Sequence, residues 1–389
     1  MNKPINNTSF DVIVIGVGSM GSSTCYFLAK RGYNVLGLEQ FSITHDKGSH
    51  AGQSRIIRKA YFEHPDYVPL LNKAYQNWKD FEEETGEHLY YKTGLVYFGK
   101  KDAPILKGIS KAASLNNIKL EKHDASSIAK TFSQFKMPID FEALYEPGAG
   151  FITPQKTIKL YEKKAIESGA IINSNEKVVE WRKDGNSILI KTDKQTYRSD
   201  KLIITAGAWA GKLIPGLTNK LKVTRQFIGW IKPKAQNDFA LNNFPCWMLS
   251  DDEKPGMYYG FPSLPVSEFG MPEGVKLAHH YPGSIVDPDN VNRNTTEDEK
   301  ESLLYVLNKY LPGCFESFLS SKTCLYTNTP DKDFIIDHLP GYENLVTIAC
   351  GFSGHGFKFV SIVGEILADL AIDGKTEQPI GFLNAKRFQ

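Results

Sequence analysis

Apolar runs alternate with segments of helical periodicity at both ends of the chain. Near the N-terminus, the apolar residues 10–15 and 34–38 flank a segment of helical character at 22–31. Near the C-terminus, the apolar run 345–350 precedes residues 360–372, where apolar side chains recur at the spacing of a helix. Strands that alternate with helices in this way predict βα units and hence an α/β domain.

Between these ends, the pattern predicts further helices and strands. An amphipathic helix is expected over residues 66–85, with its apolar stripe facing a core. The other expected elements are a strand at 90–98, mixed helix and loop at 103–135, a helix at 151–168, a strand at 170–181, an apolar strand at 202–207 and, after a polar loop, a helix within 287–311.

The middle of the chain, residues 223–281, has a different pattern. Aromatic and β-branched residues are separated there by Pro and Gly turns, which predicts antiparallel strands, among them 258–262 and 275–280. Lys276 and His280 share one face of the second strand because side chains alternate along it. If that face lines a cavity, Lys276 is a candidate functional group; the alternative is a surface lysine that reaches into solvent.

Composition and charge limit the classes of function. The 389 residues are 41% apolar and carry a formal net charge of +2 without charged blocks, which favours a soluble protein with no nucleic-acid or membrane partner. No apolar run approaches the roughly 20 residues of a membrane span. The polar residues 1–9 lack the core of a signal peptide. Five scattered cysteines without a CxxC pair predict neither a disulfide scaffold nor a metal site, so we expect a cytoplasmic protein.

A dinucleotide-binding motif joins the first two predicted strands. In Gly-Val-Gly-Ser-Met-Gly, Gly16 makes the turn, Gly18 lets a pyrophosphate approach, and Gly21 lets helix and strand pack closely. Glu39, at the end of the second strand, is placed to accept hydrogen bonds from ribose hydroxyls, which disfavours a 2′-phosphate and hence NADP. This unit alone does not distinguish FAD from NAD.

A second glycine-rich turn lies between the C-terminal strand and helix, in Gly-Phe-Ser-Gly-His-Gly-Phe-Lys-Phe at 351–359. Glycines permit a tight turn, and the free N–H groups at a helix start favour negative charge. Lys358 adds a full positive charge there. The segment therefore predicts a site for an anion, or for a group that becomes anionic, and the alternative is an ordinary βα connection.

The segment 48–58, rich in glycine and small hydroxyl residues, follows the ribose-binding strand. We expect it to form a loop that enters a helical turn, so that Arg55 and Arg58 share one face and present two cations to the cofactor. The alternative is a solvated basic face. The strand exit Thr-Ala-Gly-Ala-Trp at 205–209 is a further candidate to pass under a cofactor, although it also suits an ordinary strand end.

Together these segments resemble the monomeric sarcosine oxidase and N-methyl-L-tryptophan oxidase family of flavoenzymes. The run Asp-Phe-Ile-Ile-Asp-x-Leu-Pro-Gly and the terminal Arg387-Phe388-Gln389 are closer to the N-methyltryptophan oxidases, whereas Met248 matches the sarcosine oxidases, so the choice between them stays open. The segments that carry the resemblance, in family order along the chain, are 16–21, 48–61, 258–262, 276–280, 324–337 and 351–359.

The resemblance implies a two-domain fold. A discontinuous, Rossmann-like FAD-binding domain would comprise residues 1–87, 149–219 and 322–389. A substrate domain built on a largely antiparallel sheet would comprise residues 88–148 and 220–321. The fold class is then α/β, or α+β when the second domain is counted.

The resemblance also implies roles for individual residues. Cys324, by itself an ordinary buried cysteine, would hold FAD covalently through a thioether. The implied catalytic residues are Arg55 and Lys276, near opposite faces of the flavin, with Tyr259 and His280. The implied substrate-binding residues are Arg58, Lys358, Tyr259 and Met248. The implied cofactor-binding residues are Gly16, Gly18, Ser19, Met20, Gly21, Glu39, Gly48, Ser49, Arg55, Ala206, Gly207, Trp209, Cys324, Gly351, Gly354, His355, Gly356, Phe357 and Lys358.

The implied activity is that of a monomeric, FAD-dependent oxidase of N-methyl amino acids. It would use O2 at Lys276 and release the free amino acid, formaldehyde and hydrogen peroxide. The alternatives are an oxidase of another secondary amine or cyclic imino acid, a flavin or NAD-dependent dehydrogenase that does not use O2, and a dinucleotide-binding sensor. Ala51 and Gln53 depart from the family, which often has His and Asp at these positions, so flavin contacts near Arg55 are expected to differ.

Overall fold

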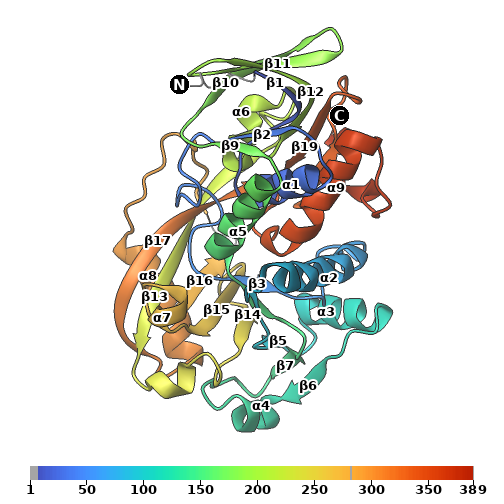
Figure 1. The fold of residues 1–389 in the computed structure, drawn as a ribbon. Coiled ribbons are helices and arrows are strands. Elements are labelled where there is room, and N and C mark those ends of the chain that lie inside the picture. The colour runs from blue at the N-terminus through green and yellow to red at the C-terminus, as the bar shows by residue number, and fades with distance from the viewer. Residues whose placement is uncertain (1–7, 281–282, 389) are drawn as a thin grey trace.

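The computed structural model describes residues 8–280 and 283–388, which form two large sheets and one small sheet (Figure 1). The expectations for residues 1–7, Tyr281 and Gln389 lie outside these residues. The first large sheet contains the N-terminal strand and the C-terminal strands, so both ends of the chain build one unit. Its strands are β1 Ser9–Ile15, β2 Val35–Leu38, β9 Ile171–Asn173, β10 Val178–Asp184, β11 Ser187–Thr192, β12 Thr196–Ile204, β18 Ile335–His338 and β19 Val346–Cys350.

The centre of this sheet is parallel, as the βα pattern predicts. β1 lies between β2 and β12, and β19 pairs in parallel with β12. Apolar residues of these strands are fully buried on both faces, as is typical of a parallel sheet covered by helices. The helices on and beside the sheet are α1 Ser19–Lys30, α2 Tyr67–Thr85, α5 Pro154–Glu167, α6 Ala210–Leu213 and α9 Val360–Asp373.

The second large sheet is largely antiparallel, which confirms the predicted fold class. Its only parallel neighbours in the described residues are β14 and β5. Its strands are β5 Leu95–Lys100, β6 Glu121–Asp124, β7 Phe141–Glu146, β13 Lys222–Pro233, β14 Cys246–Ser250, β15 Met257–Ser263, β16 Val275–His280 and β17 Phe315–Asn328. The helices next to it are α3 Pro104–Leu115, α4 Ala125–Thr131, α7 Val266–Phe269 and α8 Glu297–Tyr310.

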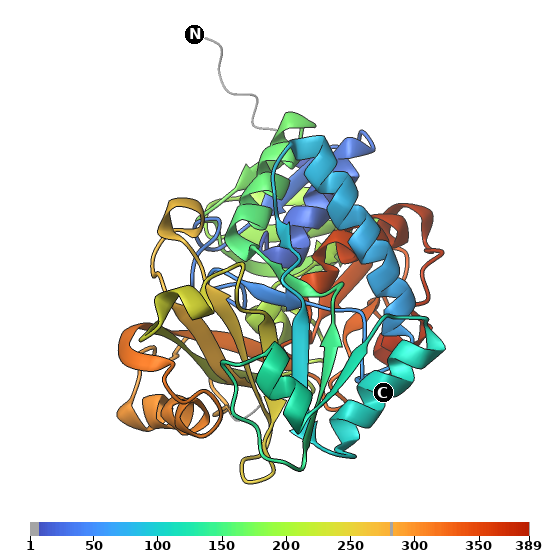
Figure 2. The ribbon, with the colours of Figure 1, turned by 90° about the horizontal axis from the view of Figure 1, so that it is seen from below.

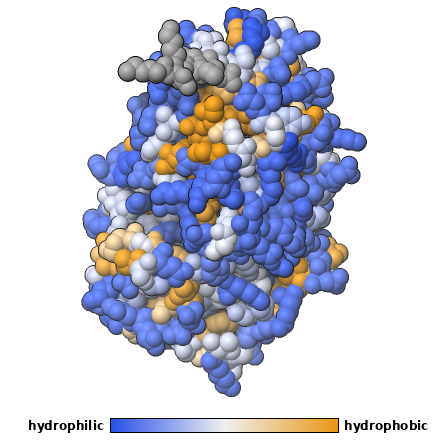
Figure 3. Space-filling view, viewed as in Figure 1, coloured by the Kyte–Doolittle hydropathy of each residue, from blue (hydrophilic) through white to orange (hydrophobic). Residues whose placement is uncertain are grey.

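The long helix α2 lies beside α9 where the two units meet (Figures 1 and 2). Its apolar stripe, Leu70, Leu71, Ala74, Trp78 and Phe81, is buried as predicted. The face in Figure 3 is mostly hydrophilic, with apolar side chains gathered over the first sheet. In the described residues no helix is long and apolar enough to cross a membrane. No group of three or more His, Cys, Asp or Glu in this part of the chain is placed to bind a metal ion.

One prediction about local structure is wrong. Residues Arg55–Ile57 form strand β3, which pairs with β8 Gly150–Ile152, and β4 Tyr90–Tyr91 pairs with β8 on its other side. The β-branched pair Ile56 and Ile57 suits an extended chain, and the ladder to β8 satisfies its backbone groups. Arg55 and Arg58 therefore do not share a helix face.

Other elements differ from the predictions mainly at their ends. The first helix begins three residues early, at Ser19. The strand expected at 90–98 is broken by Gly94, whose φ of 72° is left-handed. The helix expected at 151–168 begins only at Pro154, since the preceding residues belong to β8. Two short strands, β9 and β10, replace the one expected at 170–181.

Candidate active site

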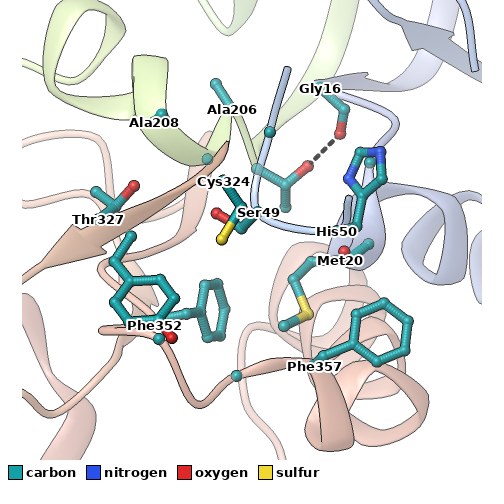
Figure 4. Close-up of a pocket in the computed structure, with 18 of the residues that line it drawn as sticks. Gly16, Met20, Ser49, His50, Ala206, Ala208, Cys324, Thr327, Phe352 and Phe357 are labelled. Carbon is teal, nitrogen blue, oxygen red and sulfur yellow. Dashed lines mark hydrogen bonds between the residues drawn. The ribbon is translucent and has the colours of Figure 1, made fainter. Parts of the chain in front are cut away.

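A cavity of about 550 Å³ lies between the two large sheets, and the segments that carry the sequence motifs line it. It is lined by the turn after β1, the loop before β3, the exit of β12, strand β17 and the glycine-rich turn before α9 (Figure 4). Strands β14 to β16 also contribute to the lining. All but two of the expected site residues lie on its wall. The exceptions are Gly21 and Lys276.

The first glycine motif packs as its spacing predicts. Gly16 has a φ of +90°, and a Cβ on it would lie 2.8 Å from the Thr205 carbonyl oxygen. A Cβ on Gly21 would lie 1.9 Å from the Gly16 oxygen, which shows that helix α1 packs tightly on the turn. This packing places Gly21 behind the cavity wall. At Gly18 a Cβ would meet nothing closer than 3.8 Å, at the His50 ring. The turn is therefore open on the cavity side.

Glu39 is held next to this turn at the end of β2. Its carboxylate accepts hydrogen bonds from the backbone N–H groups of Val17 and Phe41, each at 3.0 Å. Burial raises the pKa of Glu39 to about 7, and the two N–H groups oppose that shift. The carboxylate is thus fixed on the cavity wall, as the prediction of a ribose-binding acid requires.

The wall contains polar atoms that a bound molecule would satisfy. Among the described residues, the buried His50 Nε2 and Thr327 Oγ1 have no hydrogen-bond partner, and both residues line the cavity. Buried polar groups without partners are costly and uncommon in native proteins. Together with the open turn at Gly18 and the fixed Glu39, they fit a dinucleotide such as FAD.

Arg55 and Lys276 meet at one backbone oxygen. The Ser54 carbonyl accepts hydrogen bonds from Arg55 Nη1 at 2.8 Å and from Lys276 Nζ at 2.6 Å. Arg55 lines the cavity, whereas Lys276 lies one layer behind, 4.5 Å from the centroid of the lining Phe261 ring. Burial, followed by the charge of Arg55, lowers the pKa of Lys276 well below its usual value.

Cys324 lies on β17 at the cavity wall, next to the loop that holds Ser49 (Figure 4). The Ser49 hydroxyl donates to the Leu325 carbonyl at 2.5 Å, which ties the loop to β17. Burial raises the pKa of the Cys324 thiol, while the nearby charges of Arg55 and Lys276 oppose that shift. The charges only partly offset the burial, so the pKa of the thiol stays above its usual value and the thiolate, the reactive form of cysteine, is not the favoured form in this state.

Arg58 and Glu63 form a buried ion pair on the same wall. Arg58 Nη2 lies 2.5 Å from Glu63 Oε1, Nη1 donates to the Ala60 carbonyl, and the guanidinium stacks 4.2 Å from the Tyr61 ring centroid. The other carboxylate oxygen, Glu63 Oε2, has no partner among the described residues. Glu63 has no part in the sequence prediction, because no sequence motif marks it as a partner of Arg58.

Lys358 lies beside this pair without a carboxylate of its own among the described residues. Its side chain is 5% exposed, and Nζ donates to the His355 carbonyl at 2.6 Å. Burial, then the charge of Arg58, lowers the pKa of Lys358 to about 7, and Glu63 opposes that shift. With Lys358 protonated, two cations and one carboxylate give this end of the cavity a charge of +1, which suits a substrate anion.

His355 and His280 are held neutral by different contacts. His355 Nε2 lies 3.0 Å from the Lys332 carbonyl and so carries the proton, which leaves Nδ1 to accept from the Tyr61 hydroxyl. Burial lowers the pKa of His280 to about 3, and its Nδ1 lies 3.1 Å from the Tyr326 hydroxyl. Both rings therefore serve as neutral parts of the wall, and neither supplies a positive charge to the cavity at neutral pH.

The remaining wall near Lys358 is apolar or weakly polar. Tyr259 and Met248, both expected to contact the substrate, lie here together with residues that were not foreseen. Burial raises the pKa of Tyr259 to about 12, so the phenol is protonated. The unforeseen lining residues of this region are Ile56, Glu63, Met257, Phe261 and Tyr326.

Comparisons with known proteins identify the family. The family model described as FAD dependent oxidoreductase matches residues 11–370. Monomeric sarcosine oxidase from Streptomyces avermitilis is 36% identical over 380 residues, which cover 97% of this chain and 98% of the relative. N-methyl-L-tryptophan oxidase from Citrobacter koseri is 31% identical over 365 residues, covering 93% and 94%.

The chain belongs to the monomeric sarcosine oxidase and N-methyl-L-tryptophan oxidase family of FAD-dependent oxidoreductases. The predicted enzyme class, a flavoprotein oxidase acting on CH–NH groups, is confirmed by this membership. The choice between FAD and NAD, which the first βαβ unit left open, is settled in favour of FAD. The open form of NikD, an unusual amino acid oxidase, shares the fold, with a TM-score of 0.85, 24% identity and coverage of 97% and 98%.

Proposed function

We propose that this enzyme is an FAD-dependent oxidase of N-methyl amino acids. The observation that carries the proposal is the buried cluster of Arg58, Lys358 and Glu63 on the cavity wall, which has a charge of +1 when Lys358 is protonated. A buried positive charge without its own counterion favours a carboxylate, which gains charge-assisted hydrogen bonds there. The relatives are named as oxidases of sarcosine and N-methyl-L-tryptophan, both of which carry this group.

The residues then divide the work between binding and electrostatics. Arg58 and Lys358 hold the carboxylate and so orient the N-methyl group. Bound FAD would supply the redox chemistry, a two-electron oxidation of the C–H bond next to the nitrogen with reduction of O2 to hydrogen peroxide. Water would then hydrolyse the resulting imine to formaldehyde and the free amino acid. Lys276 and Arg55 place positive charge where negative charge develops in the reaction with O2.

The side chains around the proposed substrate position can adapt their shape, so several N-methyl amino acids are candidate substrates. Met248 and Met257 are flexible and fill irregular space, while Tyr259 and Phe261 give flat apolar surfaces. Sarcosine, N-methyl-L-tryptophan and a cyclic imino acid all present a carboxylate and a secondary amine to such a wall. A monomer in the cytoplasm stays our expectation for the state of the enzyme.

The experiment that tests the function is the assay of peroxide and formaldehyde under air. Sarcosine and N-methyl-L-tryptophan are the probes, and glycine and tryptophan, which lack the methyl group, are the controls. We expect equal amounts of peroxide and formaldehyde with one or both N-methyl amino acids only. Peroxide without formaldehyde from a cyclic imino acid would favour that substrate class, and turnover only with an artificial electron acceptor would establish a dehydrogenase.

A first prediction concerns the covalent link of FAD. Precipitation of the protein with acid should leave the yellow colour in the pellet, because Cys324 holds the flavin through a thioether. In Cys324→Ser the colour should move to the supernatant. Cys350→Ser is the control, since Cys350 is also buried but lies outside the cavity lining. Colour in the supernatant of the unaltered enzyme would remove Cys324 from this role.

A second prediction concerns pH. Burial and the charge of Arg58 lower the pKa of Lys358 to about 7 in the free enzyme, so the ammonium is lost as pH rises through that value. Carboxylate binding favours the protonated form, and binding therefore takes up a proton above this pH. KM for the amino acid should rise about tenfold per pH unit above the pKa. In Lys358→Met, KM should be high at all pH values and should not rise above pH 7. The same rise of KM with pH in that variant would exclude Lys358 as its source.

A further inference from the structure

Gln53 makes a set of contacts that the proposed function does not use. It lies outside the cavity lining, in the loop before β3. Its side-chain oxygen Oε1 accepts from Trp230 Nε1 at 2.8 Å. Its Nε2 donates to the carbonyls of Gly270 at 2.7 Å and Pro272 at 3.1 Å, with a longer contact to Phe269 at 3.4 Å. One amide thus joins a strand of the second sheet to the turn that leads into the next strand.

Gln53 binds two segments, and both help to fix the position of Lys276. Trp230 on β13 is directly opposite Lys276 on β16 in the antiparallel register, and Lys276 Nζ lies 5.8 Å from the centroid of the indole. Trp230 is fully buried, so its Nε1 depends on Gln53 for a hydrogen bond. The turn that Gln53 binds ends at Gly274, immediately before β16 begins at Val275.

Ser54, the residue after Gln53, binds Lys276 directly. The Ser54 carbonyl accepts from Lys276 Nζ at 2.6 Å, and the Ser54 hydroxyl lies 3.2 Å from the same atom. The dipeptide 53–54 therefore holds Lys276 directly and its cross-strand neighbour Trp230 through the amide of Gln53. The same Ser54 carbonyl binds Arg55, so any shift of this dipeptide moves Arg55 on the cavity wall and Lys276 behind it together.

We propose that Gln53 is a positioning residue for Lys276. Its amide fixes β13 and the turn before β16 against the loop 49–55, which sets where the lysine nitrogen lies behind the cavity wall. This inference rests on the proposed role of Lys276 in the reaction with O2. If Gln53 served only to fix an exposed turn, its replacement would lower the stability of the protein or change both half-reactions alike.

The test is Gln53→Met, which keeps the length of the side chain and removes its hydrogen bonds. The two half-reactions are measured by stopped flow: reduction of the flavin by an N-methyl amino acid without O2, and reoxidation of the reduced enzyme by O2. We expect reoxidation to slow about tenfold, as for a modest displacement of a charged group, with reduction unchanged. The combination with Lys276→Met should reoxidise no more slowly than Lys276→Met alone.

Gln134→Met is the matched control, since Gln134 Nε2 also donates to two turn carbonyls, those of Asp238 and Asn243, away from the cavity. Normal reoxidation in Gln53→Met, equal slowing of both half-reactions, or full additivity with Lys276→Met would each overturn the inference. If Gln53→Met does not fold, Trp230→Phe removes the indole donor together with part of the buried ring and is judged by the same criteria. If Lys276→Met itself reoxidises normally, the proposed role of Lys276 fails, and the inference falls with it.

Discussion

Replacement of Lys276 by methionine should slow the reaction of the reduced enzyme with O2 by about 10²- to 10³-fold, the usual effect of removing a preorganised charge from a developing anion. Lys276 is 1% exposed, lies against Phe261, and shares the Ser54 carbonyl with Arg55 at the cavity wall. Flavin reduction by the amino acid should change little, because the carboxylate is held by Arg58 and Lys358. Stopped-flow measurement of the two half-reactions separates these effects.

Lys232→Met is the control for this variant. Lys232 lies on β13, two residues from Trp230, and pairs with Glu316 at the surface. Its loss should leave both half-reactions unchanged. Equal slowing of reduction and reoxidation in Lys276→Met would refute a specific role of Lys276 in the reaction with O2.

Replacement of Arg58 by methionine should lower kcat/KM for an N-methyl amino acid by about 10²- to 10³-fold. Arg58 is 2% exposed and pairs with Glu63, so its loss removes a carboxylate-binding cation and leaves a buried carboxylate in the pocket. Removal of one partner from a buried, hydrogen-bonded charge pair costs about 2–5 kcal/mol, and each 1.4 kcal/mol is a factor of ten in rate.

Two further variants show whether charge or geometry matters at this position. Arg58→Lys keeps the charge but loses the planar fork and the stacking on Tyr61, so an intermediate loss is expected. Arg31→Met removes an arginine from the surface pair with Asp369 and should leave kcat/KM unchanged. A normal kcat/KM in Arg58→Met would contradict the assignment of this residue to the substrate carboxylate.

The parts of the fold that were predicted correctly are those with a strong local signal. Strand, glycine turn and helix follow one another within a few residues at Gly16 and again at Gly354, and both turns require residues without a Cβ. The buried stripe of α2 is likewise set by periodicity, as is the alternate facing of β16, where Val275 and Leu277 pack in a different core cluster from Ala278.

The errors and omissions arise from contacts between distant segments. Arg55 was expected on a helix, but pairing with β8, almost a hundred residues later in the chain, makes the segment a strand. Glu63 was missed because its pairing with Arg58 depends on how the loop between β3 and α2 turns back. The position of Lys276 behind the wall depends on Ser54, more than two hundred residues away, which no local pattern reveals.

The most direct test of the proposed carboxylate site is the anaerobic mixing of the yellow enzyme with matched pairs of amines. Sarcosine is compared with dimethylamine, and N-methyl-L-tryptophan with N-methyltryptamine, so that each pair differs in the carboxylate. We expect at least one N-methyl amino acid to bleach the flavin absorbance rapidly, and its carboxylate-free partner to do so far more slowly. Equal bleaching by both members of a pair would contradict a carboxylate site at Arg58 and Lys358, and no bleaching by either amino acid would contradict the proposed oxidation of N-methyl amino acids.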